Sequence, residues 1–280
     1  ILAPVLDINR EPRMGREGET YGEDSTLAAA MGSAYTRGVQ KQGEGECRAE
    51  SVAKHYMGFH QSEGGIHGTV CSIPERLLRE VYGLPFQAAI AEENLRGVMP
   101  CYCSIGGEPV SASEHLLTQI LHQEMGFDGV AVADYGAVSN VHHTQKLYET
   151  EAEAGLACLS AGMDVELPDT VCFNEEMKAM FAQGKADMAL LDQAVRRVLR
   201  AKFRMGLFEH PFALTGSALS EMVHHPEDEL ITLQSALESL VLLKNDNHVL
   251  PVGKNVRKIA LIGPHADNAR HFFGGYTHLS

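Results

Sequence analysis

Residues 129–138 read GVAVADYGAV. The apolar run Val130–Ala133 consists of small or β-branched residues, which is typical of a strand buried on both faces. An acid, Asp134, follows directly, and then an aromatic residue and a glycine. A carboxylate at the end of such a strand is partly desolvated and rigidly aimed. Asp134 is therefore either a helix cap or ion-pair partner, or a catalytic nucleophile or base.

Apolar runs of strand length alternate along the chain with segments of helical period. The runs cover residues 1–8, 51–59, 96–103, 129–135 and 161–167. The helical segments centre on residues 27–39, 77–86, 116–125 and 190–203. Continuous rather than alternating apolar strands, separated by helices, predict a parallel sheet covered on both sides. Both a (β/α) barrel and an open doubly wound sheet satisfy this pattern.

Polar residues follow several of the predicted strands at their carboxyl ends. They are Asp7, Lys54 with His55, Tyr102, Asp134 and Glu166. In a barrel all of these ends converge on one face, whereas an open sheet spreads them along an edge. Convergence favours the barrel. Since only five of about eight strands are evident, we expect an incomplete (β/α)8 barrel of the TIM type.

Composition changes after the last long helix. We expect the barrel domain to occupy residues 1–206 and a linker rich in Pro, Gly and Ser to occupy 207–225. Residues 226–245 predict an acidic-started helix that runs into a short strand, and VRKIALIGPHAD (256–267) predicts another buried strand. Residues 226–280 therefore resemble the start of a second α/β domain.

Charge and cysteine content exclude several classes of protein. The net charge of −14, from 23 basic and 37 acidic residues, disfavours nucleic acid and anionic membranes as partners. No apolar run is long enough to span a membrane. Six cysteines are too few for a disulfide scaffold, and neither Cys101–Cys103 nor the three histidines at 55, 60 and 67 match a zinc spacing. We expect reduced, buried thiols, no metal, no cofactor and a small neutral or cationic substrate.

Two loops are rich in glycine and polar residues. In NREPRMGREGETYGED (9–24), Arg13 and Arg16 can form bidentate pairs with the acids at 19, 23 and 24. The loop GFHQSEGGIHG (58–68) matches neither a phosphate-binding loop nor a dinucleotide fingerprint.

Several of these segments together resemble glycoside hydrolase family 3, in that family's order. They are APVLDINREPRMGREGETYGED (3–24), AKHYMGF (53–59), VMPCYC (98–103), VAVADYGA (130–137), LVLLKNDNHVLPV (240–252) and IALIGPHAD (259–267). The first four resemble the family's barrel motifs. The last two resemble the entry to its second domain, an α/β sandwich.

The resemblance implies a role for each matching residue. Asp134 lies where the family has its catalytic nucleophile. The implied substrate-binding residues are Arg16, Lys54, His55, Met99, Tyr102 and Tyr135. The first three match residues that hydrogen-bond the non-reducing sugar, and Met99 and Tyr102 match the wall of the site. Tyr135 replaces a tryptophan that is common at its position.

The implied activity is hydrolysis of terminal β-D-glycosyl residues by a retaining mechanism. The loop at 58–68 lacks the Asp-Ser-His ending of the N-acetylhexosaminidase branch, which favours a β-glucosidase or β-xylosidase acting on oligosaccharides or on aryl or alkyl β-glycosides. No cofactor is required, a homodimer is compatible, and the compartment is not indicated.

The acid/base residue is not evident. In the family it is usually a glutamate of the second domain, and neither Glu63 nor Glu166 matches its motif. We therefore interpret the chain as an internal piece of a longer enzyme that is inactive alone. The alternatives are a non-catalytic sugar-binding barrel that has lost its acid/base, and an unrelated phosphate-handling barrel, which the charge and the lack of a phosphate loop disfavour.

Overall fold

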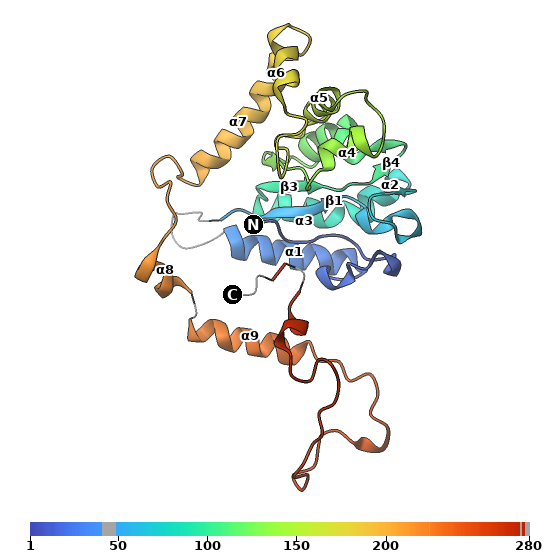
Figure 1. Cartoon of the computed structure of the whole chain (residues 1–280), viewed down its shortest axis with the longest axis vertical. Coiled ribbons are helices and arrows are strands. Elements are labelled where there is room, and N and C mark those ends of the chain that lie inside the picture. The colour runs from blue at the N-terminus through green and yellow to red at the C-terminus, as the bar shows by residue number, and fades with distance from the viewer. Residues whose placement is uncertain (41–48, 224, 275, 278–280) are drawn as a thin grey trace. The chain divides into compact units, whose positions relative to one another are not determined.

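The computed structural model describes residues 1–40, 49–223, 225–274 and 276–277 (Figure 1). The chain divides into two compact units, residues 1–212 and 213–280.

The first unit is built on a parallel sheet. Strand β3 (Gly97–Pro100) lies between β1 (Val52–Tyr56) and β6 (Val130–Ala131) and is parallel to both. Because parallel neighbours need a long crossover, each consecutive pair is connected through helices. The predicted parallel sheet is thus confirmed for the runs at 51–59, 96–103 and 129–135.

Single parallel bridges extend this sheet at both sides. Val5 bridges Lys54, which places the segment 1–8 beside β1, and Val132 bridges Val165, which places the segment 161–167 beyond β6. All five predicted runs therefore lie side by side in chain order, although the outer two form bridges rather than full strands.

Helices pack around the sheet. In Figure 1, α1 and α3 lie below β1 and β3, and α4 and α5 lie above them. The α-helices of the first unit are α1 (Ser25–Gln40), α2 (Glu75–Leu77), α3 (Leu84–Glu93), α4 (Ala137–His143), α5 (Glu151–Ala161), α6 (Glu175–Ala182) and α7 (Met188–Arg204). Two π-helical segments, η5 (Leu78–Tyr82) and η7 (His115–Glu124), and a small sheet of β2 (Val70–Cys71), β4 (Ser104–Ile105) and β5 (Glu108–Pro109) complete the unit.

The predicted helices differ in their outcome. The segments 27–39 and 190–203 are confirmed as α1 and α7, and 116–125 is helical with π-type hydrogen bonds. The prediction of one helix over 77–86 is wrong, because η5 ends at Tyr82 and α3 begins afresh at Leu84. Pro85 has no N–H to donate to the preceding turn, so the helix cannot continue through it.

Buried apolar side chains fix β6 and the residues that connect it to Asp134. Ala131 and Ala133 are fully buried and Val130 is nearly so. The described cysteines are also buried and form no disulfide, as predicted; they are Cys71, Cys101, Cys103, Cys158 and Cys172. Cys47 lies outside the described residues.

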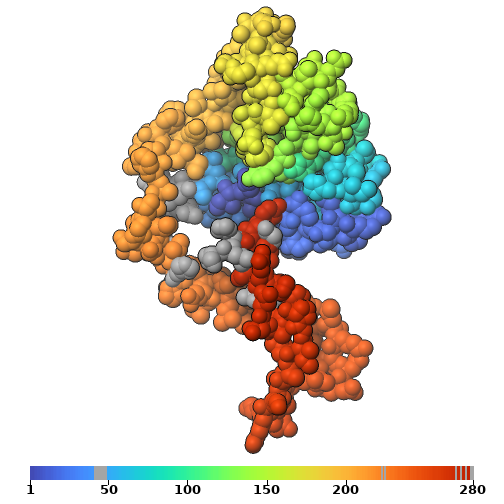
Figure 2. Space-filling view, in the orientation of Figure 1, coloured from blue at the N-terminus to red at the C-terminus, as the bar shows by residue number. Residues whose placement is uncertain are grey.

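The second unit contains α8 (Gly216–Met222) and α9 (Pro226–Glu238). The segment predicted as a linker, 207–225, thus holds a short helix. The two predicted strands are wrong, because in the described part of this unit no strand forms, and Leu243 and Ile262 are about nine-tenths exposed, at 92% and 89%. A buried strand needs neighbours for its backbone groups and side chains. In Figure 2 the red residues form a narrow, elongated group that offers few such neighbours.

No helix among the described residues is both long and apolar enough to cross a membrane.

Gly129 offers a test of this packing. A Cβ at this position would lie 2.1 Å from the carbonyl oxygen of Arg96, a backbone atom that cannot rotate away. We expect Gly129→Ala to destabilise the complete protein by roughly 1–3 kcal/mol or more, measured by urea unfolding. Gly38→Ala is the matched control, because nothing lies within 4 Å of its Cβ position and alanine favours the helix by about 0.5–1 kcal/mol. Equal stability of the two variants would contradict the packing described.

Candidate functional site

Asp134 follows the end of β6 and the bridging residue Val132. Its side chain is only 15% exposed, and its Oδ1 accepts the backbone N–H of Tyr135 at 2.8 Å. It does not cap α4, whose N-cap residue is Gly136 with φ 73° and no side-chain cap. The left-handed backbone at Gly136 turns the chain away from the carboxylate. Of the interpretations open from sequence, the helix cap is excluded.

His55 faces Asp134 from β1, which is separated from β6 by β3. Its Nε2 lies 3.6 Å from Oδ2 of Asp134. The pairing of β1 with β3 shifts register between Lys54 and Tyr56, so that His55 is the residue left out of the regular pairing. Such irregularities re-aim a side chain next to functional sites. His55 is thereby directed at the carboxyl end of β6.

Asp7 holds the other side of the His55 ring. Its Oδ2 lies 2.7 Å from Nδ1 of His55, and its two oxygens lie 3.4 and 3.3 Å from the backbone nitrogen of the same residue. The Asp7 side chain is fully buried and that of His55 is 2% exposed. The pair is a fixed part of the site and not a surface contact.

Arg16 lies on the solvent side of His55. Its guanidinium donates two hydrogen bonds of 2.7 Å to the carboxylate of Glu19, and one of its nitrogens lies 3.4 Å from Nε2 of His55. The bidentate pair is the one predicted for this loop, whereas Arg13 pairs with Glu11. The Arg16 guanidinium lowers the pKa of Glu19 below its ordinary range.

Phe59 is the apolar centre around which these groups gather. Its ring centroid lies 4.7 Å from that of His55, 5.0 Å from that of His67 and 6.1 Å from that of Tyr102. The guanidinium carbon of Arg16 stands 5.4 Å from the same centroid, which is cation–π geometry. Burial lowers the pKa of His67 below its ordinary value, so this imidazole stays neutral near pH 7.

A hollow of about 280 Å³ opens beside Asp134. It is lined by His67, Gly68, Tyr102, Tyr135, Asn140, Thr144 and Gln145. Tyr135, adjacent to Asp134, is 58% exposed, and the hydroxyl of Tyr102 donates to the Tyr135 carbonyl at 2.9 Å. Aromatic rings around a polar hollow suit a ligand with both apolar faces and hydroxyl groups.

The remaining residues that the sequence singled out lie on the central strands. Lys54 is in β1, and its strand partner in β3 is Met99. Met99 is 2% exposed and is not among the residues that line the hollow.

The two glutamates considered as acid/base are engaged elsewhere. Glu166 is buried and accepts the backbone N–H groups of Cys172 and Phe173 at 2.8–3.0 Å. Glu63 accepts the hydroxyl of Ser72. Across the described ranges, no group of three or more His, Cys, Asp or Glu side chains could hold a metal ion.

Asp7, Glu19, Phe59 and His67 were not among the predicted catalytic and substrate-binding residues, although Asp7 was expected at the same face of the sheet. For Asp7 the signal was present, because it ends the first apolar run as Asp134 ends the fourth. For Phe59 and His67 the sequence carries no such signal, because they belong to the site through ring contacts, including one between Phe59 and Tyr102, which are far apart in the chain.

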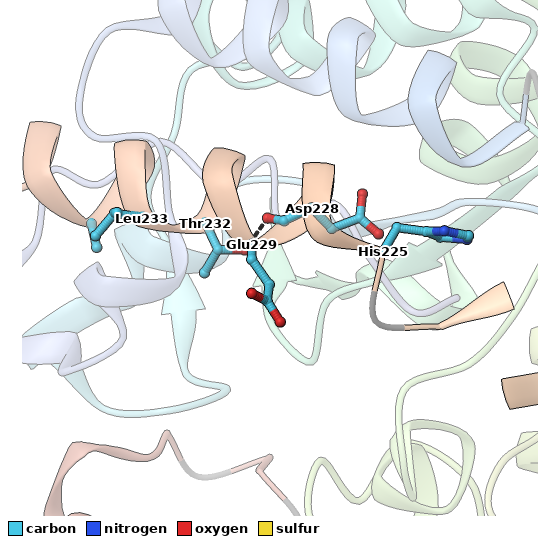
Figure 3. Close-up of a pocket in the computed structure, with 6 residues that line it drawn as sticks. His225, Asp228, Glu229, Thr232 and Leu233 are labelled. Atoms are coloured by element: carbon cyan, nitrogen blue, oxygen red, sulfur yellow. Dashed lines mark hydrogen bonds between the residues drawn. The ribbon is translucent and has the colours of Figure 1, made fainter. Parts of the chain in front are cut away.

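A second hollow, of about 510 Å³, runs along α9 and contains none of these residues. Figure 3 shows its lining, which comes from successive turns of α9 and from the N-cap residue before it: His225, Asp228, Glu229, Thr232, Leu233 and Ala236. The hydroxyl of Thr232 donates to the Asp228 carbonyl at 2.8 Å, a bond within the helix. All six residues are exposed, and none of them belongs to the group around Asp134.

Comparison with known proteins identifies the family. The model of the glycosyl hydrolase family 3 N-terminal domain matches residues 1–201. The chain belongs to glycosyl hydrolase family 3. Among family 3 relatives, it is 35% identical to a β-xylosidase from Formosa agariphila over 298 residues, which cover 99% of this chain and 40% of the relative. It is 34% identical to a lysosomal β-glucosidase from Dictyostelium discoideum, covering 99% of this chain and 35% of the relative.

Solved structures agree with this assignment. A β-glucosidase from Listeria innocua superimposes with a TM-score of 0.84 at 31% identity, over 90% of this chain and 35% of that one. The same enzyme has been solved with glucose and, as a mutant, with laminaribiose. The family 3 chain described here spans 40% or less of the length of these relatives.

The Arg16–Glu19 pair of this family 3 chain makes a direct prediction. The pKa of Glu19 is lower in the folded than in the unfolded protein, so the ionised carboxylate stabilises the fold at any pH above the unfolded pKa. This stabilisation is lost as the pH falls through the pKa of the folded state. We expect Arg16→Gln to raise the pKa of Glu19 toward its ordinary value, measured by carboxyl NMR titration. Glu75 is the control, because its pKa is lowered by Arg79 and should not change. An unchanged Glu19 titration would disprove the coupling.

Proposed function

We propose that this chain is the part of a retaining β-glycosidase that carries the catalytic nucleophile, Asp134. The supporting observation is the position of this carboxylate: it ends a buried parallel strand, is 15% exposed, and has His55 at 3.6 Å. It caps no helix, and a partly buried acid that follows a parallel strand at its carboxyl end is a candidate catalyst.

The proposed reaction proceeds in two displacements. The ionised Asp134 attacks the anomeric carbon of a β-glycoside while an acid protonates the departing oxygen, and a covalent glycosyl–enzyme forms. Water, deprotonated by the same acid/base residue, then attacks the anomeric carbon and releases the sugar with its original configuration. This chemistry needs no metal or cofactor.

Arg16, Lys54 and His55 are proposed to bind the hydroxyl groups of the non-reducing sugar. Arg16 is held by Glu19 in a two-bond fork, so its remaining N–H groups have a fixed direction. Met99 and Tyr102 form the wall, and Tyr135 lies where the departing group leaves. These assignments rest on the match of motifs together with the contacts described above.

The acid/base residue is proposed to lie outside this chain. Glu166 and Glu63, the candidates considered within it, are bonded to backbone N–H groups and to Ser72. The two carboxyl groups of a retaining enzyme lie about 5–5.5 Å apart, so the partner of Asp134 must approach the open side of the site.

The names of the relatives support a proposal for the substrate class, and the motif order supports one for the architecture. Their names specify β-glucosidases and β-xylosidases, and we propose a β-glucoside or β-xyloside as substrate, with glucosides favoured. We further propose that residues 1–206 belong to a (β/α)8 barrel that is incomplete here, that 207–225 link it onward, and that 226–280 begin an α/β sandwich domain.

Covalent labelling tests the nucleophile. A fluorosugar with a good leaving group forms the glycosyl–enzyme faster than water releases it, so the intermediate accumulates. We expect peptide mass spectrometry of the full-length gene product to find this label on Asp134. We expect Asp134→Asn to reduce turnover on the order of 10⁴-fold or more, because the attacking oxygen is lost.

Asp128→Asn is the matched control. Asp128 precedes the same strand at its other end and pairs with Arg204, so its replacement should leave labelling and turnover unchanged. Label on another residue would overturn the assignment. Sugar binding without any label would instead indicate the non-catalytic sugar-binding barrel.

The two arginine pairs of the first loop offer a second test. Lysine cannot form the two-bond fork, so Arg16→Lys should lower kcat/KM for aryl β-glucosides and β-xylosides by about 10- to 100-fold. Arg13→Lys breaks a similar pair with Glu11 on a side chain that is 67% exposed, and should change kcat/KM by less than about twofold. Equal effects of the two variants would contradict a sugar-binding role for Arg16.

A further inference from the structure

Asp7 is a fully buried acid with one close polar partner residue, His55. Both the ring and the backbone nitrogen of His55 face its carboxylate, at 2.7 Å and at 3.3–3.4 Å. A carboxylate that faces two N–H groups of one residue fixes both the position of its backbone and the rotation of its ring.

The contact also determines which ring nitrogen carries a proton. An ionised carboxylate only accepts hydrogen bonds, so Nδ1 of His55 must donate. Nε2 is then the nitrogen left for the site, and it lies between Arg16 at 3.4 Å and Asp134 at 3.6 Å. A neutral His55 accepts there, and a protonated one donates.

His60 approaches Asp7 from the other side but is not an equivalent partner. Its Nε2 lies 3.9 Å from Oδ2 of Asp7, beyond hydrogen-bond distance, and neither of its buried ring nitrogens has a hydrogen-bond partner among the described residues. Burial lowers its pKa, so it stays neutral. The Asp7 charge therefore acts mainly on His55.

We propose that Asp7 is a positioning residue for glycoside hydrolysis, which acts through His55 by fixing its ring and its Nδ1 proton. Asp7 is too buried to touch a sugar. It presents Nε2 of His55 to a sugar hydroxyl beside Asp134. This inference rests on the proposed function.

The test is a double-mutant cycle in the full-length enzyme, read as kcat/KM on an aryl β-glycoside. Asp7→Asn keeps the shape of the side chain. Its amide can donate to Nδ1 as well as accept from it, so the proton of His55 is no longer confined to Nδ1. We expect a loss of about 10- to 100-fold, the usual effect of removing a residue that orients a functional histidine. In a His55→Ala background the same change should cost less than about twofold, because its target is gone.

Asp164→Asn is the matched control. Asp164 is as buried, with a side chain 1% exposed, and it binds the N–H of Ala131 and the guanidinium of Arg197 instead of a histidine. Its replacement should change kcat/KM by the same factor in both backgrounds. An Asp7→Asn effect that is equally large without His55, or no effect at all, overturns the inference.

The outcomes separate the two proposals. Wild-type enzyme that takes no fluorosugar label at Asp134 overturns the proposed function, whereas labelled enzyme with undiminished Asp7→Asn activity overturns only the role of Asp7. Should Asp7→Asn fail to fold, nitrogen NMR of the histidines in the unaltered protein decides. A proton on Nδ1 of His55 supports the inference, and an unprotonated Nδ1 overturns it.

Discussion

Parallel pairing of β1, β3 and β6 brings the carboxyl ends of the three strands to one edge of the sheet. The functional groups lie at or beyond this edge: His55 in β1, Tyr102 after β3 and Asp134 after β6. Each belongs to a different strand–helix unit, so their spacing is set by the distance between neighbouring strands and not by any local loop. A change of register in any pair would move one group away from the others.

A series of paired polar groups is the second feature of the site. From the interior outward, Asp7 faces His55, His55 faces Arg16 and Asp134, and Arg16 faces Glu19. Each charged group thus meets a hydrogen-bonding partner of suitable type, which offsets part of the cost of removing it from water. The chain is acidic as a whole, yet its candidate site contains a cationic group, Arg16, beside His55.

Much of this could be predicted from the sequence. The run before Asp134 predicted its strand because strands buried on both faces are continuously apolar, and α1 and α7 followed from helical spacing. The break between η5 and α3 could not be separated from one helix, since apolar spacing changes little over a single turn. The prediction of strands in the second unit was wrong because an apolar run only favours a strand, whereas a strand forms only when a neighbouring strand pairs with it.

The site was predictable where chemistry is carried by residue type, and not where it depends on contact. Arg16, His55 and Asp134 could be singled out by type and motif. The link from Asp7 to His55 spans 48 positions, and the register shift between Lys54 and Tyr56 that leaves His55 out of the regular pairing has no signature in composition. Burial of Met99 depends on its partner strand, which only the folded sheet defines.

Phe59 has a consequence for how this site can be altered. Its ring touches Arg16, His55, His67 and Tyr102, which come from four separate segments of the chain. Residues that pack against the same side chain do not respond to substitution independently, because displacing one of them shifts the ring against which the others pack. Substitutions made at these positions one at a time should therefore give non-additive effects. The four positions and Phe59 form one unit of redesign.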